Sequence, residues 1–192
     1  MKPSMRVLDD REIHDIHCAS LNVLEDVGVM VLDDRARKIY AGAGAVLDGS
    51  GRVRLPARLV HAALQACSPV VVLHGREGSP PMRVGGSRLY FGTCGYPTSV
   101  VDWKTGEIRP PVMADLEDTA RLTDELDHIS FIMPPLSPED VPVEKTDRYQ
   151  WKACLLNTRK HILNQAYGAE GLRDAVAMAS EVAGGLDRLC RA

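Results

Sequence analysis

The sequence predicts an α/β protein built from an N-terminal helical and β-hairpin region, residues 1–87, and the first units of an incomplete (β/α)8 barrel of TIM type, residues 88–192. Three observations carry this prediction. Helical periodicity dominates the first 66 residues, short strands separated by Gly and Pro follow up to residue 109, and buried-type strands then alternate with helices. Such alternation is typical of a parallel sheet covered by helices.

Three helices are expected in the N-terminal region, over residues 11–27, 33–41 and 56–66. Asp9 or Asp10 can cap the first helix, and Gly28 can end it in a left-handed conformation. Pro56 suits the first position of the third helix. The segments 45–47 and 52–55 flank the turn sequence Asp-Gly-Ser-Gly, which predicts a small hairpin.

The middle of the chain reads as a series of short strands, over residues 70–73, 82–84, 88–91 and 99–102. Gly85-Gly86 is a two-residue hairpin signal between the second and third of these strands. Lys104-Thr105-Gly106 predicts another turn, which returns the chain towards Ile108.

The last part alternates helices over residues 115–126, 146–157 and 171–183 with strands over residues 129–133 and 161–166. With a first strand from 88–91 or 99–102, this makes about three β/α units, whereas a closed barrel needs eight. We therefore expect an interrupted barrel. Its strand edges would be prone to aggregation unless they are covered, which leaves a homo-oligomer open.

Composition excludes several classes of function. The formal net charge is −3, from 23 basic and 26 acidic residues, so no nucleic-acid partner is expected. Apolar runs such as residues 70–73 are far shorter than the roughly 20 residues of a membrane span, and no signal-peptide core follows the N-terminus. The 5 cysteines are scattered without a C-x-x-C pair. We expect a cytoplasmic protein with reduced thiols, no membrane association and no bound metal.

An ordered series of segments resembles one known family. The series includes residues 24–29 and 41–46, and it is strongest over residues 101–109, Val-Asp-Trp-Lys-Thr-Gly-Glu-Ile-Arg. It continues through 121–124 and 127–129 to 183–185. In order and register, these segments resemble the trimethylamine methyltransferase family, which includes a pyrrolysine-containing enzyme and pyrrolysine-free relatives that act on quaternary amines.

The resemblance implies a β/α barrel that moves a methyl group from a tertiary or quaternary methylated amine, of trimethylamine or glycine betaine type, to a corrinoid protein. The cobalamin is carried by that partner protein, so no cofactor is expected to bind this chain directly. Family members are considerably longer and place pyrrolysine beyond residue 192, so the chain is expected to be truncated and inactive alone. The alternative is a non-catalytic module that binds a methylated amine or another subunit.

Proteins bind methylated cations with aromatic faces and nearby carboxylates, and barrel enzymes place such groups at the carboxyl ends of strands. The segment 90–96 offers Tyr90, Phe91 and Tyr96. A strand end packed in the core, with a turn at Tyr96-Pro97, is the favoured alternative for this segment. Cys94 has no activating neighbour in the sequence and is expected to be a small buried residue.

Two further strand ends are candidates. Met133-Pro134-Pro135 ends one strand and could shape a pocket floor, or could simply be extended by proline. Gln165 and Tyr167 end the next strand and alternate with Asn164 and Ala166, so one of the two pairs could point into the barrel mouth. No catalytic residue is predicted within the chain.

Two other patterns have simpler explanations. His14 and His17 lie three residues apart on a predicted helix, but no third ligand accompanies them, which favours exposed polar residues over a metal site. Asp102 precedes the Trp103-Lys104-Thr105-Gly106 turn and is expected to cap that turn with its own carboxylate.

Overall fold

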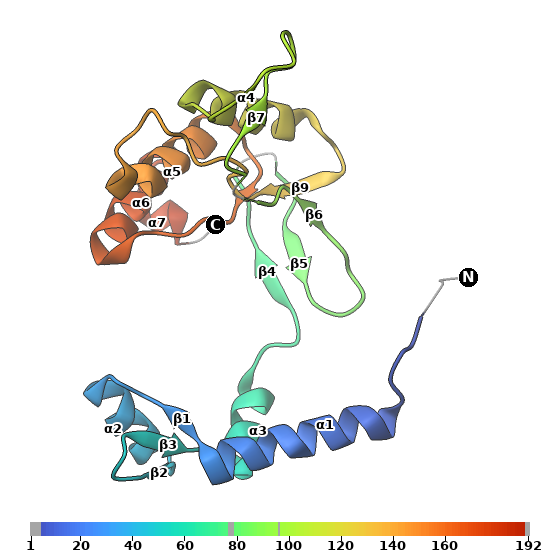
Figure 1. The fold of residues 1–192 in the computed structure, drawn as a ribbon, viewed down its shortest axis with the longest axis vertical. Helices are drawn as coiled ribbons and strands as arrows, with labels where there is room; N and C mark the ends of the chain where they lie inside the picture. Colours follow the sequence, from blue (N-terminus) through green and yellow to red (C-terminus); the bar gives the residue numbers. More distant parts are fainter. Residues whose placement is uncertain (1–4, 77–78, 96, 191–192) are drawn as a thin grey trace. The chain divides into compact units, whose positions relative to one another are not determined.

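The computed structural model describes residues 5–76, 79–95 and 97–190. The chain divides into two compact units, Met1–Ser68 (unit 1) and Pro69–Ala192 (unit 2), which are described separately below. The predicted boundary after residue 87 marks the start of the barrel-type units and stays a prediction. The predicted mixture of helices and strands is confirmed (Figure 1).

Unit 1 combines helices with a three-stranded antiparallel sheet of order β1-β3-β2. Its elements are α1 (Asp10–Asn22), the π-helical turn η1 (Val23–Val27), β1 (Val29–Met30), α2 (Asp34–Gly42), β2 (Val46–Leu47), β3 (Arg52–Arg54) and α3 (Ala57–Ala66). The predicted hairpin is confirmed, because β2 and β3 pair in antiparallel register with Leu47 opposite Val53.

Local signals explain where α1 begins and where its continuation η1 ends. Asp9 accepts a hydrogen bond from the Glu12 backbone N–H at 2.8 Å, and Glu12 accepts one from the Asp9 N–H at 2.8 Å, which together form a capping box. Gly28 ends η1 with φ +72°. A Cβ on Gly28 would lie 2.5 Å from the Val53 carbonyl oxygen, so the turn and the approach of β3 both require glycine.

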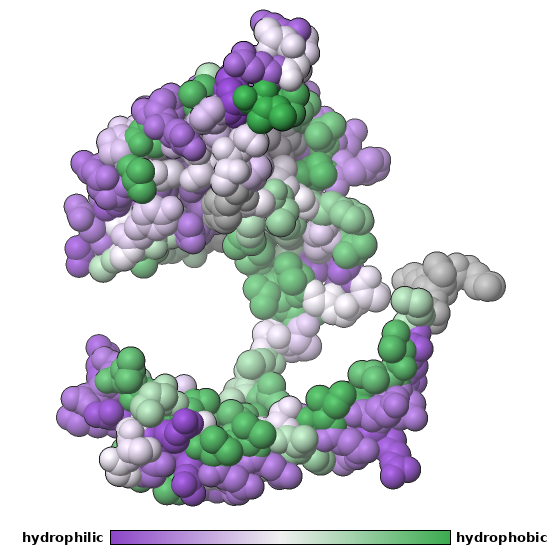
Figure 2. Space-filling model, viewed as in Figure 1, coloured by the Kyte–Doolittle hydropathy of each residue, from purple (hydrophilic) through white to green (hydrophobic). Residues whose placement is uncertain are grey.

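Unit 1 has little interior. Within residues 5–68, Leu21 and Val53 are the buried hydrophobic side chains. The apolar residues Ile13, Ile16 and Val23 of α1 and η1 are more than half exposed, and apolar side chains are visible along this segment in Figure 2. The helices of this unit therefore bury little of their apolar surface.

Unit 2 begins with an antiparallel pair, β4 (Val71–Leu73) and β5 (Met82–Val84), and then contains a three-stranded parallel sheet of order β10-β9-β6. The remaining elements, in chain order, are β6 (Phe91–Gly92), β7 (Val100–Val101), β8 (Ile108–Arg109), α4 (Met113–Glu125), β9 (Ile129–Ile132), the 3-10 turn η2 (Val143–Lys145), α5 (Thr146–Asn157), β10 (His161–Ile162), α6 (Gly168–Ala183) and α7 (Leu186–Leu189).

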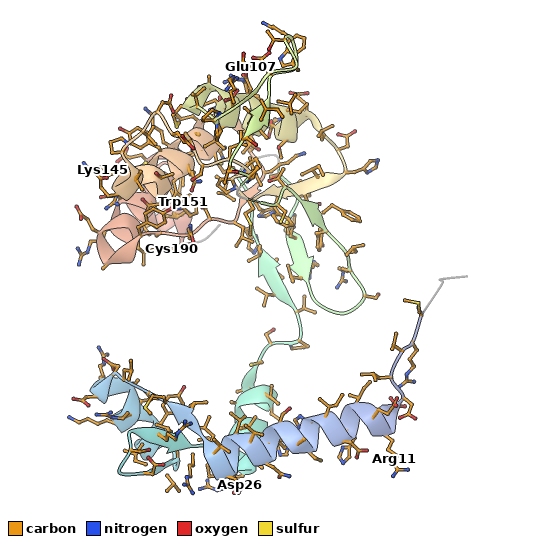
Figure 3. All side chains as sticks on the ribbon, in the orientation of Figure 1. Arg11, Asp26, Glu107, Lys145, Trp151 and Cys190 are labelled. Atoms are coloured by element: carbon orange, nitrogen blue, oxygen red, sulfur yellow. The ribbon has the colours of Figure 1, made fainter. Side chains whose placement is uncertain are left out.

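The parallel sheet confirms the predicted alternation of strands and helices. The helix α4 precedes β9, α5 connects β9 to β10, and both strand pairs of the sheet are parallel. The first strand comes from the segment predicted at 88–91, whereas 99–102 supplies β7, which pairs with β8 in a separate hairpin. Glu107, labelled in Figure 3, lies in the turn segment of that hairpin.

Two predictions about strands are wrong. The Gly85-Gly86 hairpin does not form between 82–84 and 88–91, because β5 pairs instead with β4 and the following segment leads to the parallel sheet. Gly85 has φ +140°, and a Cβ there would lie 2.4 Å from the Pro69 carbonyl oxygen. The strand predicted over 161–166 ends at Ile162. Leu163 still donates its backbone N–H to the Ile132 carbonyl oxygen at 2.9 Å, and beyond it α5 side chains bind the Gln165 carbonyl oxygen and the Tyr167 N–H.

The core of unit 2 lies where α4 and α5 pack on the sheet. Leu116, Leu136 and Ala153 form one buried cluster, and Ala120, Ile132 and Cys154 form a second, with Ile162 packed against it. Burial raises the pKa of the Cys154 thiol to about 12, so Cys154 behaves as a small apolar side chain. These contacts fix β9 and β10 against the helices.

Candidate functional site

The carboxyl ends of β6, β9 and β10 lie side by side, because the three strands are parallel neighbours. The segments that follow them are 93–95, 133–135 and 163–167. In open parallel sheets, ligands bind outside this edge of the sheet. We call these three segments the strand-end site.

Thr93 ties two of the three strand ends together. Its hydroxyl donates to the Met133 carbonyl oxygen at 2.6 Å and accepts from the Met133 backbone N–H at 3.0 Å. One side chain thus satisfies both backbone polar groups of Met133 beyond the end of β9. The hydroxyl holds the loops after β6 and β9 at a fixed separation.

Gly92 and Phe131 are register partners in the neighbouring strands β6 and β9. A Cβ on Gly92 would lie 2.3 Å from the Phe131 ring, so the ring rests directly on the glycine. The next residue, Ile132, is fully buried among α4 and α5 residues. Since successive strand residues point to opposite faces, Phe131 lies on the face of the sheet away from that cluster.

The loop after β10 is held by two side chains of α5. Trp151, labelled in Figure 3, donates its indole N–H to the Gln165 carbonyl oxygen at 3.0 Å. The Tyr167 backbone N–H donates to Asp147 at 2.6 Å. The loop therefore has a fixed backbone although it lies outside the sheet ladder.

Asp147 is fully buried. Its carboxylate lies 3.4 Å from the guanidinium of Arg148, which also contacts Asp174 at 2.9 Å and Glu170 at 3.6 Å. A Cβ on Gly171 would lie 2.4 Å from an Asp147 oxygen, so a glycine in α6 makes room for the carboxylate. A buried charge needs such partners, and here they join α5, α6 and the loop between β10 and α6.

Asn164 has unused hydrogen-bonding capacity at the strand-end site. Its Oδ1 accepts from the Gln165 backbone N–H at 2.9 Å, but its buried amide nitrogen Nδ2 has no hydrogen-bond partner among the described residues. A buried polar atom without a partner calls for an explanation, such as water or a ligand. The structure thus draws attention to Asn164 rather than to its neighbour Gln165, whose side chain is exposed.

The predicted site residues fall into separate groups. Gln165 and Tyr167 lie in the loop after β10, and Tyr167 is 40% exposed. The hydroxyl of Tyr90 accepts from the Arg83 backbone N–H at 2.9 Å, and Phe91 is 60% exposed on β6. Tyr96 lies outside the described residues.

The strand order separates these two groups. The strand β9 lies between β6 and β10, so the outer strands are about 10 Å apart. No hydrogen bond in the described part of the chain joins Tyr90 to the loop after β10. The role of all five predicted residues in substrate binding stays a prediction.

The structure adds Thr93, Phe131 and Asp147, which the sequence analysis did not single out. For Thr93, the sequence does contain a signal, because a hydroxyl-bearing residue closely follows a predicted strand. The pairing of Phe131 with a glycine depends on strand register, and Asp147 reads in sequence as an ordinary acidic residue in the first turn of a helix. Cys94 is exposed, so the expectation of a buried thiol is wrong there, because the residue lies in the loop after β6.

Asp102 caps its turn as predicted. Its carboxylate accepts from the backbone N–H groups of Lys104 at 2.9 Å and Thr105 at 3.2 Å, and these bonds lower the pKa of Asp102. Arg109 makes a two-pronged contact with Asp115, at 2.7 and 2.9 Å, and lies 3.6 Å from Asp102. These ion pairs attach the β7–β8 hairpin to the start of α4.

Two kinds of feature are absent from the described residues. Within residues 5–76, 79–95 and 97–190, no group of three or more His, Cys, Asp or Glu side chains is arranged to hold a metal ion. In the same residues, no helix is long and apolar enough to cross a membrane.

Comparison with known proteins identifies the family. The sequence model of the family described as Trimethylamine methyltransferase (MTTB) matches residues 1–189. The chain belongs to the trimethylamine methyltransferase family. The resemblance that the sequence predicted is therefore confirmed, and it extends through both units.

Individual relatives agree with the family match. A trimethylamine methyltransferase of Desulfitobacterium hafniense is 30% identical over 181 residues, which cover 94% of this chain and 36% of that protein. A trimethylamine methyltransferase of Methanosarcina barkeri is 30% identical, covering 78% of this chain and 31% of the relative. A glycine betaine methyltransferase of Desulfitobacterium hafniense is 23% identical, covering 96% and 38%. The chain thus spans about a third of the length of these curated relatives.

Proposed function

We propose that this chain forms the first β/α units of a (β/α)8 barrel whose reaction is methyl transfer from a tertiary or quaternary methylated amine to a corrinoid protein. The observation that carries the proposal is the parallel β6-β9-β10 sheet with its intervening helices, in a chain that belongs to the trimethylamine methyltransferase family. The strand-end site would form one wall of the substrate site. Further β/α units have to supply the facing walls, because three strands do not close a barrel.

The residues of the strand-end site suit the recognition of a methylated cation. Such a cation offers no hydrogen-bond donor when quaternary, and aromatic faces attract it through their quadrupole. Phe131 lies on the sheet face away from the helices, and Tyr167 is 40% exposed in a loop held by α5. The unpartnered Asn164 amide would orient a carboxylate, as in glycine betaine, or a bound water.

In the reaction, the corrinoid supplies a reduced cobalt as the methyl acceptor. The carbon–nitrogen bond breaks and its electron pair stays on the amine nitrogen, so the amine leaves with one methyl group fewer. A corrinoid carried by a partner protein needs no metal ligand from this chain. The contribution of this chain is to position the methylated nitrogen and to exclude water.

Calorimetric titration tests the binding half of the proposal. Glycine betaine and 3,3-dimethylbutanoate have the same shape, but only the former carries a positive charge. We expect binding of glycine betaine or trimethylamine, and Tyr167→Leu should weaken it about two- to fivefold, which corresponds to about 0.5–1 kcal/mol for an exposed cation–π contact. Tyr40→Leu, at a residue of similar exposure in unit 1, is the matched control. Equal binding of 3,3-dimethylbutanoate, which lacks the positive charge, would contradict cation recognition.

A methyl-transfer assay with a reduced corrinoid protein tests the reaction. We expect no turnover by residues 1–192 alone, and turnover by a chimera in which the further units come from the Desulfitobacterium hafniense glycine betaine methyltransferase. Turnover by residues 1–192 alone would refute the assignment of the facing walls to further units. A chimera that binds the amine without transferring its methyl group would favour the non-catalytic binding module instead.

A further inference from the structure

A cavity of about 580 Å³ lies in unit 2, apart from the strand-end site. It is bounded by the segment after β4, the end of α5, the last turns of α6 and the helix α7, and α5, α6 and α7 pack side by side (Figure 1). Three arginines from separate segments line it: Arg76 after β4, Arg159 after α5 and Arg188 on α7. Its other ionisable lining residues are His74 and Glu181, which are both exposed. Positive charge therefore predominates in this cavity.

Arg76 is incompletely hydrogen-bonded. Its Nη1 donates to the Leu155 carbonyl oxygen at 2.7 Å, at the end of α5, but its buried Nε has no hydrogen-bond partner among the described residues. Burial lowers the pKa of the Arg76 guanidinium, because the charged form loses hydration there. A buried cation with an unused donor calls for a partner, such as water or a ligand of opposite charge.

The carboxylate of Asp124 on α4 is already occupied by other groups. Its charge favours the charged form of Arg76, but it accepts hydrogen bonds from the Thr158 hydroxyl at 2.8 Å and the Arg159 backbone N–H at 2.7 Å. It also accepts from Nε and Nη2 of Arg159, at 3.2 Å each. A carboxylate has about four acceptor sites, so none remains for Arg76. Among the described residues, no carboxylate forms an ion pair with Arg76 or Arg188.

A second cavity, of about 320 Å³, shares part of its lining with the first, including Arg76. Apolar side chains line much of it, among them Trp151 and Ile162. The indole N–H of Trp151 is bonded to the loop after β10. The polar lining residues Lys160 and His161 contact backbone carbonyl oxygens. The combined cavity therefore has a cationic part and an apolar part.

We propose that the combined cavity binds an organic phosphate monoester, with its phosphate held by Arg76, Arg159 and Arg188 and its apolar part beside Trp151 and Ile162. A planar guanidinium group matches phosphate oxygens in a two-pronged contact. A phosphate monoester carries about −1.5 to −2 charges near neutral pH, which balances the two arginines that have no carboxylate partner. A carboxylate ligand would balance only one of them.

The cavity lies at the opposite end of β10 from the strand-end site. Leu155 and Arg159 precede β10 in the chain, whereas the strand-end residues 163–167 follow it. A phosphate ester in this cavity does not compete with an amine at the strand-end site. The proposal therefore does not rest on methyl transfer.

Calorimetric titration of the complete 192-residue chain with phenyl phosphate, at low ionic strength, tests the site. We expect one site in the original chain. Arg188→Gln should weaken binding at least about tenfold, because it removes a charge-assisted hydrogen bond. Arg173→Gln is the matched control, since it removes the same charge at an exposed position of α6 outside the cavity, and it should change binding less than about twofold. No binding by the original chain, or equal weakening in the two variants, would overturn the proposal.

Three further compounds separate the parts of the ligand. Phenol lacks the phosphate, inorganic phosphate lacks the apolar part, and benzoate carries a carboxylate in place of the phosphate. Phenyl phosphate should bind more tightly than each of them. Equal binding of phenol or benzoate would overturn the assignment of the phosphate to the arginines, and equal binding of inorganic phosphate would overturn the assignment of an apolar part.

Nitrogen-15 NMR of the arginine Nε–H groups tests the role of Arg76. Substitution of Arg76 also removes its contact with Leu155, so its own resonance is a better readout than the affinity of an Arg76 variant. The Arg76 resonance, assigned from its absence in Arg76→Lys, should shift on addition of phenyl phosphate, whereas the Arg173 resonance should not. Saturation with phenyl phosphate without a shift of the Arg76 resonance would refute the role of Arg76 in the site.

Discussion

Unit 1 and unit 2 are stabilised in different ways. Unit 2 has two clusters of buried hydrophobic residues between α4, α5 and the parallel sheet, whereas unit 1 buries Leu21 and Val53 and leaves much of the apolar side of α1 exposed. In unit 1 the elements are set by caps, turns and a glycine at positive φ, such as the Asp9–Glu12 capping box and Gly28. The comparison suggests that substitutions in unit 2 act through packing, and that those in unit 1 act through backbone geometry.

The largest effect is expected for Leu116→Ala in unit 2. Leu116 is fully buried between α4 and α5, and truncation of such a leucine costs about 2–5 kcal/mol through lost burial and a residual cavity. Both tryptophans of the chain, Trp103 and Trp151, lie in unit 2, so fluorescence during urea unfolding reports on this unit. Leu122→Ala, on the same helix at a leucine that is 60% exposed, should change stability by less than about 0.5 kcal/mol. Equal losses of unfolding free energy in Leu116→Ala and Leu122→Ala would contradict the packing argument.

In unit 1, a substitution that changes backbone geometry is expected to lower stability more than one that changes side-chain packing. Gly28→Ala places a Cβ 2.5 Å from the Val53 carbonyl at φ +72°, so it should destabilise unit 1 by about 1–3 kcal/mol. Gly42→Ala is the control, because nothing lies within 4 Å of the added Cβ and alanine favours the helix by about 0.5–1 kcal/mol. Hydrogen exchange in residues 29–54 measures both effects. If Gly28→Ala left the stability of unit 1 unchanged, this would show that unit 1 tolerates a shift of β3.

The ion pair at the start of α4 should give a pH-dependent contribution. The side-chain hydrogen bonds from Arg109 lower the pKa of Asp115, so this carboxylate stabilises the fold fully above its unfolded pKa of about 3.9 and loses its contribution as the pH falls through the lower folded value. Asp115→Asn should cost about 1–2 kcal/mol at pH 7, because it removes charge-assisted hydrogen bonds.

Urea unfolding at pH 7 and at decreasing pH below 4.5 measures this contribution. The difference between the original chain and Asp115→Asn should shrink in that acid range. Asp118→Asn, on the same helix with a largely exposed side chain, is the control and should cost less than about 0.5 kcal/mol at pH 7. A constant difference down to pH 2 would contradict the assignment to the Asp115 carboxylate.

The sequence predicted what local chemistry determines. The helix stop at Gly28, the turn capped by Asp102 and the hairpin around residues 48–51 each depend on neighbouring residues, and all are observed. The Gly85-Gly86 prediction is wrong because the sequence alone does not decide whether residues 82–84 pair with the strand before them or the strand after them. Their observed pairing with β4 depends on contacts between residues that are distant in sequence.

The candidate site was harder to predict than the fold for the same reason. The sequence places Gln165 and Tyr167 at the end of the strand that becomes β10, but the hydrogen bonds that hold this loop come from Trp151 and Asp147 of α5. Asn164 was recognised only as part of an alternating pair, since its unpartnered amide is a property of the packed loop. The family was recognised because many weak local segments occur in one order along the chain.

The smallest expected effect concerns the strand-end site. Thr93→Val keeps the shape of the side chain but removes the hydroxyl that donates to and accepts from the Met133 backbone, at an expected net cost of about 0.5–1.5 kcal/mol. The core of unit 2 stays intact, so the loss should appear as faster hydrogen exchange at residues 131–133 and not in α5. Thr98→Val, at an exposed threonine in the same loop, is the control. Faster exchange throughout unit 2 would show instead that the Thr93 hydroxyl contributes to the core of the unit, and that the strand-end site and the packed helices unfold together.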